Sequence, residues 1–218
     1  MNNIVTTADG SHTIYVPELN EHYHSLHGAV QESEHIFINC GFDFCEADPV
    51  NIFEVGFGTG LNALLTAVRS KNGNREVFYT SIEKYPLENH LCGELNYPRF
   101  AGESGAGLFG LINSSPWGEM MNICRNFSIM KLRGDLVTDN ITGNYDLIYY
   151  DAFGPDKQPE MWSASIFKKI SALTVKGGIL MTYSSKGEVK SNLKYSGFKV
   201  SRLPGPPGKR HIIRAIKI

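Results

Sequence analysis

Short apolar runs alternate with segments of helical character through most of the chain. The runs are rich in β-branched and aromatic residues and predict buried strands at residues 50–55, 76–83, 126–135, 145–153 and 179–185. The intervening segments predict helices at residues 60–71, 85–95, 158–178 and 187–197. This alternation predicts an α/β fold with a mostly parallel sheet.

Both ends of the chain depart from this alternation. The strand patterns at 198–205 and 209–218 flank the turn sequence "PGPPG", which predicts an antiparallel pair. Residues 1–48 contain one strand pattern, "SHTIYV", and one helical pattern, "GAVQESEHIFINCGF". We therefore expect a small N-terminal cap over residues 1–48 and a main domain over 49–218. The glycine-rich segment 101–119 predicts a loop or short helices.

The composition is that of a globular protein. Hydrophobic residues make up 42% of the 218 residues and charged residues 20%, which permits a buried core and excludes wholesale disorder. The sequence has no apolar run of membrane-spanning length and no secretory leader pattern, so we expect a cytoplasmic protein without membrane contact. The cysteine and histidine spacings match no metal-binding pattern, so we expect no metal.

The charges are unevenly distributed although the whole chain has a net charge of −1. Residues 186–218 carry nine basic side chains and one acidic side chain, a net charge of +8, whereas the remainder carries −9. Such a basic end is either a solvated surface balanced by nearby acids or a docking face for a phosphate backbone. The charge pattern alone leaves both interpretations open.

The sequence "EVGFGTG", residues 54–60, predicts a nucleotide-binding turn between a strand and a helix. Its glycines, Gly56, Gly58 and Gly60, permit positive φ angles and close approach of a ligand to the backbone. A dinucleotide turn would require a third glycine at the position of Leu61, and a P-loop would require a following lysine. The spacing excludes these two classes, although a turn that binds nothing remains an alternative.

Acidic residues stand at the ends of three predicted strands. Glu54 precedes the glycines, Glu83 ends the second strand, and Asp135 follows the third. An acid at the position of Glu83 can accept hydrogen bonds from ribose hydroxyls, and Asp135 can receive an adenine amino group. Each acid taken alone is commonly a helix cap or a surface charge, but together they favour a site for an adenosine moiety.

A fourth acid, Asp151, ends the strand expected beside the first one. The sequence that follows it, Phe153-Gly154-Pro155, predicts a stiff turn that could hold the Phe153 ring against a planar base. A carboxylate at this position can accept a proton from an alkylamine, orient its nitrogen and stabilise the cationic product of methyl transfer. A helix cap or turn former is the structural alternative.

Six stretches together resemble a known family of enzymes. The stretches are "DGSHTIYVPELNEHYHSLHGAVQESEHIFI", "FEVGFGTGLNALL", "SIEKYPL", "YDLIYYDAFGPDKQPEMW", "GGILMTYSSKGEVKSNLKYSGF" and "PGPPGKRHIIRA". They resemble the methyltransferase domain of the MnmC-type bifunctional enzymes that modify the tRNA wobble uridine, and still more its stand-alone relatives. The resemblance spans nearly the whole chain.

The resemblance implies a class I fold of S-adenosyl-L-methionine (SAM) methyltransferases, with a Rossmann-like sheet. It implies methyl transfer from SAM to 5-aminomethyl(-2-thio)uridine at position 34 of tRNA, with Asp151 as the acid beside the amine. The implied cofactor-binding residues are Glu54, Gly56, Gly58, Gly60, Glu83, Asp135 and Gln31. The implied substrate-binding residues are Tyr23, Phe153, Gly154, Pro155, Lys157, Lys209 and Arg210, with the basic end docking the anticodon arm.

Other functions remain as alternatives. The chain could methylate another amine on a small molecule or a protein, or it could be a tRNA- or SAM-binding module without catalysis. The sequence has no second glycine-rich nucleotide turn of the kind expected for the flavin oxidase domain of the bifunctional enzymes. We therefore expect it to use an amine supplied by a separate enzyme and to need no flavin.

Overall fold

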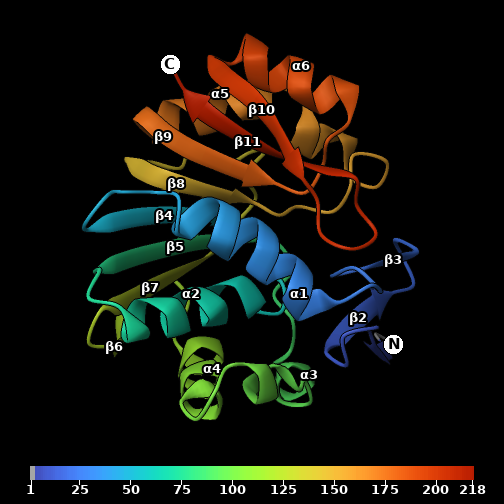
Figure 1. The fold of residues 1–218 in the computed structure, drawn as a ribbon, viewed down its shortest axis with the longest axis vertical. Coiled ribbons are helices and arrows are strands. Elements are labelled where there is room, and N and C mark those ends of the chain that lie inside the picture. The colour runs from blue at the N-terminus through green and yellow to red at the C-terminus, as the bar shows by residue number, and fades with distance from the viewer. Residues whose placement is uncertain (1–2) are drawn as a thin grey trace.

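The computed structural model describes residues 3–218. They form an eight-stranded sheet, which lies between two layers of helices, and they also form a separate three-stranded sheet. The large sheet has the strand order β10-β11-β9-β8-β4-β5-β7-β6 (Figure 1). Its strands are β4 (Val50–Val55), β5 (Val77–Glu83), β6 (Met120–Cys124), β7 (Phe127–Arg133), β8 (Tyr145–Tyr150), β9 (Thr174–Thr182), β10 (Phe198–Pro204) and β11 (His211–Lys217). The helices are α1 (Ala29–Ser33), η1 (Glu34–Phe42), α2 (Leu61–Asn72), α3 (Asn89–Gly93), η2 (Tyr97–Phe100), α4 (Gly105–Ser114), η3 (Pro159–Trp162), α5 (Ala164–Leu173) and α6 (Gly187–Tyr195).

The predicted fold class is confirmed. Strands β4, β5, β7, β8 and β9 pair in parallel, whereas β10 and β11 form the predicted antiparallel pair at one edge. The first strand, β4, lies between β5 and β8, as the sequence predicts for the first and fourth strands. The carboxyl ends of these three strands therefore meet at one edge of the sheet, where ligands bind in folds of this class.

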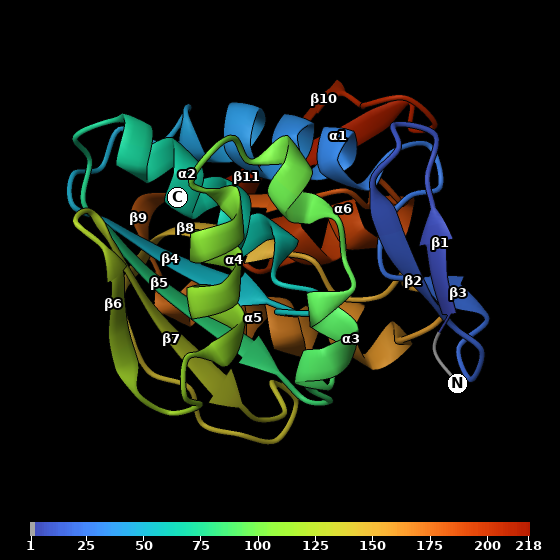
Figure 2. The same ribbon diagram turned by 90° about the horizontal axis from the view of Figure 1, so that it is seen from below.

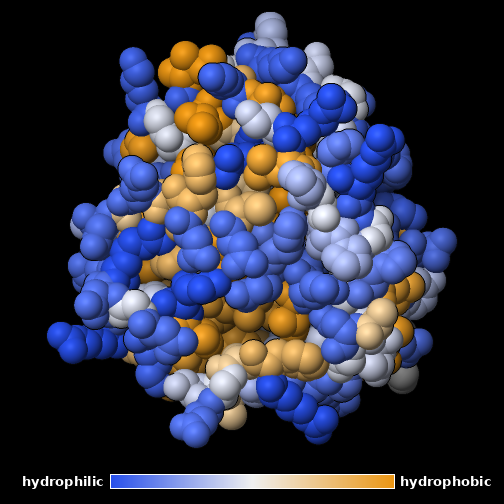
Figure 3. Space-filling view, viewed as in Figure 1, coloured by the Kyte–Doolittle hydropathy of each residue, from blue (hydrophilic) through white to orange (hydrophobic). Residues whose placement is uncertain are grey.

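Both faces of the central strands are buried, and successive residues contribute to different cores. Ile52 and Tyr149 belong to the core beneath η1, α2 and α4, whereas Phe53 and Tyr150 belong to the core beneath α5 and α6. Glu54 shares the face of Ile52, because side chains alternate along a strand, and it therefore points toward α2. Figure 3 shows mostly hydrophilic side chains outside the η1 and α2 layer, with hydrophobic ones in bands on either side.

The N-terminal part forms its own small sheet at the carboxyl ends of the parallel strands (Figure 1 and Figure 2). It contains β1 (Asn3–Thr6), β2 (His12–Val16) and β3 (Glu21–His22), all antiparallel. The predicted strand at 11–16 corresponds to β2, and the helix predicted at 28–42 corresponds to α1 followed by η1, which is a π-helix. The sequence pattern does not predict β1, β3 or the π-helical winding of η1.

Three predicted elements differ in the structure. The helix predicted at 158–178 divides into η3 and α5, and the chain already enters β9 at Thr174, before the two glycines, where the pairing with β8 shifts register. The helix predicted at 85–95 shortens to α3. Segment 101–119 contains a regular helix, α4, whose Leu108, Phe109 and Ile112 are buried despite its three glycines. Tertiary packing overrides weak local propensity in these places.

None of the helices formed by residues 3–218 has the length and apolar character needed to cross a bilayer. Within the same residues, no group of three or more histidine, cysteine, aspartate or glutamate side chains is arranged to hold a metal ion.

Candidate active site

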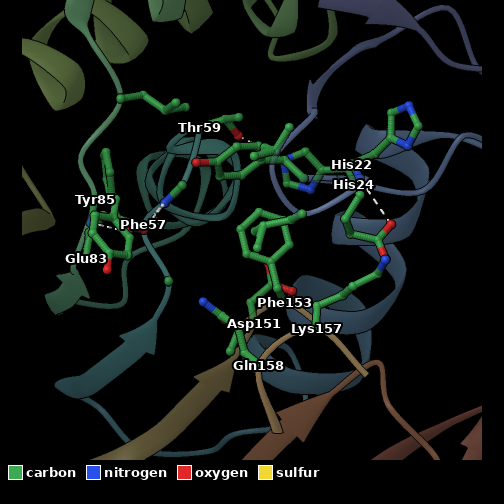
Figure 4. A pocket seen from close by; sticks show the side chains of 18 of the residues that line it. His22, His24, Phe57, Thr59, Glu83, Tyr85, Asp151, Phe153, Lys157 and Gln158 are labelled. Carbon is green, nitrogen blue, oxygen red and sulfur yellow. Dashed lines mark hydrogen bonds between the residues drawn. The ribbon is translucent and has the colours of Figure 1, made fainter. Parts of the chain in front are cut away.

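A cavity of about 1790 Å³ opens at the carboxyl ends of β4, β5 and β8. Its walls come from the glycine turn, the segments after β5, β7 and β8, the N-terminal residues and the turn between β10 and β11. In Figure 4, Glu83, Tyr85 and Phe57 lie on one side, and Asp151, Phe153 and Lys157 lie on the other. Because pockets for one drug-sized ligand measure roughly 300–1,000 Å³, this cavity has space for two ligands side by side.

The glycine turn forms one wall of the cavity. Gly56, Gly58 and Gly60 have φ values of +93°, +51° and +78°, a region that side-chain-bearing residues rarely adopt. A Cβ atom on Gly56 would lie 2.8 Å from the backbone oxygen of Asp151, and one on Gly58 would lie 3.0 Å from the Tyr23 ring. Gly60 caps α2 without lining the cavity. The turn thus presents bare backbone and a helix N-terminus to the cavity.

Glu83 and Asp135 both line the cavity, as predicted from their strand-end positions. The Glu83 carboxylate accepts hydrogen bonds from the backbone N–H of Gly58, at 3.0 Å, and of Tyr85, at 2.9 Å, which fixes it beside the glycine turn. Asp135 pairs with Lys84, at 2.9 Å, and the pKa of its carboxyl is lowered chiefly by this lysine. Both acids therefore face the cavity, and Asp135 does so in ionised form because its pKa is lowered.

Asp151 follows β8 directly and lines the cavity opposite Glu83. Its backbone N–H donates to the oxygen of Val55, at 3.0 Å, so the pairing of β8 with β4 sets its position. Its Oδ2 accepts a hydrogen bond from Asn62 Nδ2, at 2.8 Å. Burial raises the pKa of this carboxyl to about 7, although the bond from Asn62 acts in the opposite direction. Its charge state therefore changes near neutral pH.

The segment after Asp151 forms the turn that the sequence predicts. Phe153 contacts Tyr23 edge to face, with ring centroids 5.0 Å apart, and its backbone oxygen accepts a hydrogen bond from the Trp162 indole at 2.8 Å. Lys157 Nζ donates to the backbone oxygen of Asn20, at 3.1 Å, and Gly154 also lines the cavity. Tyr23, Phe153, Gly154 and Lys157 thus meet at one place, although Tyr23 is 130 residues before Phe153 in the sequence.

Glu32 and Lys209 bring the two ends of the chain together over the cavity. Lys209 Nζ lies 2.5 Å from Glu32 Oε1, and Glu32 Oε2 accepts the backbone N–H of Ser25 at 3.0 Å. His24 is half-buried beside them and its ring forms a hydrogen bond with Thr59 Oγ1 at 2.8 Å; desolvation lowers its pKa to about 4, so it is neutral at physiological pH. Lys209 lines the cavity. Its charge is engaged by Glu32.

Besides Gly60, four of the predicted site residues do not line the cavity. Glu54 is completely buried below the glycine turn, and burial raises the pKa of its carboxyl to about 8. Gln31 is exposed on α1 and points away, whereas its neighbour Glu32 reaches the cavity. Pro155 and Arg210 also lie outside the lining, and Arg210 is exposed. The direct ligand contacts predicted for Glu54, Gln31 and Pro155 stay predictions that the cavity lining does not support, because the alternation along β4, the winding of α1 and the tight turn place these residues outside it.

The sequence analysis missed several polar residues of the cavity. Asn62, Thr59 and Tyr183 all line it, and Tyr183 donates a hydrogen bond to the backbone oxygen of Ala152 at 2.8 Å. Asn62 is the most informative of them because it is a polar residue at a helical position that is otherwise apolar, two residues after Gly60. A polar residue buried in the first turn of a helix that follows a ligand-binding turn is a signal that could have identified it.

Comparisons with known proteins agree with this geometry. Residues 125–218 match a family described as S-adenosyl-L-methionine-dependent methyltransferase. The chain is 30% identical over 206 residues to the tRNA 5-methylaminomethyl-2-thiouridine biosynthesis bifunctional protein MnmC of Campylobacter hominis, covering 93% of this chain. It is also 30% identical to the MnmC of Cupriavidus metallidurans, covering 91% of this chain. The chain spans about a third of these relatives, 31% of each.

Solved structures extend the likeness to the fold. The structure of MNMC2 from Aquifex aeolicus superimposes with a TM-score of 0.79 at 27% identity, over 99% of this chain and 70% of that one. Spermidine synthase from Thermotoga maritima superimposes with a TM-score of 0.53 at 9% identity, over 100% of this chain and 71% of that one, a likeness of fold alone. The resemblance identified from the sequence motifs, and SAM as the cofactor, are thereby confirmed.

The glycine turn provides a test of the cofactor site. Gly56→Ala would place a methyl group against the backbone of Asp151 at a φ of +93°, so we expect SAM affinity to fall by at least about tenfold and the melting temperature to decrease. Gly107→Ala is the matched control, because a Cβ there meets nothing within 4 Å inside α4, and it should bind SAM normally and unfold slightly higher. Equal SAM affinity of the two variants, measured by calorimetry, would contradict this role of the turn.

Proposed function

We propose that the chain methylates the aminomethyl group of 5-aminomethyl(-2-thio)uridine at the wobble position of tRNA, because part of it matches an S-adenosyl-L-methionine-dependent methyltransferase family and it is similar to one part of the MnmC proteins. The observation that carries this proposal is the placement of Asp151. Its carboxyl lines the cavity beside the glycine turn, and burial holds its pKa near 7. This is a suitable group for taking a proton from an alkylamine as the nitrogen is methylated.

The cavity residues fit the cofactor. Gly56 and Gly58 leave bare backbone where a side chain would fill the space, and Glu83 presents carboxylate oxygens that can accept from ribose hydroxyls. We assign Asp135 to the far end of the same site, toward the adenine, because it lines the cavity after β7. When bound, SAM supplies the methyl group as an electrophile, and Asp151 faces the position where an accepting nitrogen must lie.

Burial makes Asp151 a better base for this reaction. An alkylammonium has a pKa near 10.4, so transfer of its proton to an ordinary aspartate is unfavourable by about 9 kcal/mol. With the carboxyl pKa at about 7, the same transfer is unfavourable by about 5 kcal/mol. Asp151 can therefore hold the ammonium by charge and take its proton, so that the neutral nitrogen can attack. Once the carboxyl has released this proton to solvent, it can pair with the methylated ammonium. Glu32 is also buried and lines the cavity, but its carboxylate is engaged by Lys209.

The remaining cavity wall suits a nucleobase. Phe153 and Tyr23 present aromatic surface next to Asp151, and stacking of a base on such a ring contributes about 1–3 kcal/mol. We propose that the flipped-out uridine stacks here, with its aminomethyl group directed at Asp151. Residues 3–48 act as a cap in this proposal, because Tyr23, His24 and Glu32 close the cavity from that side.

The exposed basic residues near the cavity would contact the tRNA backbone. Lys209 is engaged by Glu32, whereas Arg202 and Arg210, on β10 and at the adjoining turn, are exposed. Their position beside a cavity-lining turn suits contacts to the phosphates that flank the wobble nucleotide. We propose the turn 205–210 and β10 as the docking surface for the anticodon arm.

Removal of the Asp151 carboxylate should stop the chemistry without removing the cofactor. We expect Asp151→Asn to lower kcat by roughly 10²–10⁴-fold, because the amide cannot accept the proton, with SAM affinity within a few fold of the wild type. The rate is measured as methyl gain at the wobble nucleoside by mass spectrometry. Asp156→Asn is the control, since Asp156 lies exposed in the same loop. An Asp151→Asn enzyme as active as this control would contradict the proposal.

Activity and stability should respond to Asp151 in opposite directions as pH rises. The rate should increase from pH 6 to 8, because the carboxyl loses its proton near pH 7 and only then can act as a base. Since the folded-state pKa is raised, the folded protein binds this proton more tightly than the unfolded chain, and stability falls as pH rises from about 4 to 7. Asp151→Asn should therefore stabilise the fold more at pH 8 than at pH 4, as measured by urea unfolding. A pH-independent effect would contradict the raised pKa.

Neutralising the docking surface should weaken tRNA binding selectively. We expect Arg202→Ala with Arg210→Ala to reduce the slope of log affinity against log salt by about 2, with unchanged SAM affinity. Lys71→Ala is the control, because Lys71 is exposed at the far end of α2 from the cavity. If the control weakens tRNA binding as much as the double variant, the docking surface lies elsewhere.

A further inference from the structure

A buried chain of hydrogen bonds runs from β5 to Asp151. Ser81 Oγ donates to Glu54 Oε2 at 2.6 Å, and Asn62 Nδ2 donates both to Glu54 Oε1 at 3.1 Å and to Asp151 Oδ2 at 2.8 Å. Ser81 and Glu54 are completely buried, and Asn62 is 3% exposed. The chain therefore connects the interior of the sheet to the carboxyl that faces the cavity.

An asparagine is well suited to the middle position of this chain. A primary amide carries two N–H groups on one nitrogen, so Asn62 can donate to two carboxyls at the same time. Its own Oδ1 is buried without a hydrogen-bond partner among the described residues, which is unfavourable for folding. An apolar residue would avoid this cost, so the amide has a use beyond packing α2 against β4.

Asp151 is held on one side only. Its Oδ2 accepts from Asn62, whereas Oδ1 accepts no hydrogen bond from residues 3–218. A carboxylate with one oxygen fixed and the other free presents that free oxygen in a defined direction. An approaching ammonium can use Oδ1 without displacing any protein donor.

We propose that Asn62 is a positioning residue for Asp151, and that Glu54, anchored by Ser81, fixes the orientation of the Asn62 amide. This inference rests on the proposed role of Asp151 as the proton acceptor. In this proposal Glu54 lies below the glycine turn, outside the cavity lining, and affects the reaction through its hydrogen bond with Asn62. Asn62, two residues after Gly60, links the glycine turn to the proposed base.

The protonation of Glu54 is consistent with this arrangement. Burial raises the pKa of its carboxyl to about 8, so at neutral pH it is mostly uncharged and adds little repulsion to the ionised form of Asp151. Glutamine can take the same place, with its oxygen toward Asn62 and its amide toward Ser81. The titratable or charged side chains that face Asp151 are Glu54, Glu32, Lys209, Tyr79 and Tyr183.

The first measurement is independent of any substrate. The Asp151 carboxyl is titrated by NMR in protein labelled with ¹³C at aspartate carboxyls, and its resonance is identified by its loss in Asp151→Asn. We expect Asn62→Ala to raise the measured pKa of Asp151 by about one pH unit, because the ionised form loses a hydrogen bond. Asn122→Ala, at the exposed β6 edge, is the control and should leave the titration unchanged. An unchanged Asp151 titration in a folded Asn62→Ala protein would overturn the proposal.

The second measurement separates positioning from packing. We expect Asn62→Ala to lower kcat at pH 7 by about tenfold or more and to shift the pH–rate profile upward, with a smaller change in SAM affinity. Glu54→Leu should have a similar effect, and Glu54→Gln should recover most of what Glu54→Leu loses. An equal loss of kcat in Glu54→Leu and Glu54→Gln would overturn the proposed role of Glu54. Variants with a lower melting temperature but normal kcat would also overturn it. If wild-type protein fails to methylate tRNA, the proposed function fails while the NMR titration still decides this inference.

Discussion

The site depends on the contact between two strand ends, where the backbone after β4 meets the backbone after β8. Asp151 N–H donates to Val55, and Gly56 leaves so little space that a Cβ there would lie 2.8 Å from the Asp151 oxygen. Gly56 N–H also donates to Ile82 of β5, at 3.0 Å. These contacts place Glu83 and Asp151 on opposite sides of one glycine turn. Regular parallel pairing thus holds the acid proposed for cofactor binding and the proposed proton acceptor in fixed positions relative to each other.

The burial of this frame determines its chemistry. Removal from water raises the pKa of the Asp151 carboxyl. The hydrogen bond from Asn62 limits this rise because it stabilises the ionised form. Glu54 is buried more completely and is mostly protonated at neutral pH, so two acids linked by one amide differ in charge state. The difference follows from exposure, since Asp151 faces the cavity and Glu54 faces α2.

Much of this arrangement could be predicted from local sequence, because it follows from strand ends and turns. Glu83 and Asp151 end apolar runs, and the glycine spacing alone excludes a dinucleotide turn and a P-loop. The sequence predicts segment 101–119 only as a loop or short helices, because three glycines weaken the helical pattern of α4, which packing stabilises. The Glu32–Lys209 pair also could not be predicted, because it joins residues 177 positions apart whose meeting depends on how the N-terminal part folds over the cavity. The sequence predicts that Asn62 lies in a helix, but it does not predict the hydrogen bonds from Asn62 to Glu54 and Asp151.

The central claim is that a buried aspartate beside a SAM site accepts the proton of an alkylamine on tRNA. The most direct test incubates the purified protein with SAM carrying an isotopically labelled methyl group and with tRNA containing 5-aminomethyluridine, and then measures the wobble nucleoside by mass spectrometry. The account predicts the gain of one labelled methyl group on the amine nitrogen, at a rate that rises with pH through about 7. Absence of label from that nucleoside, in protein shown to bind SAM, would contradict it.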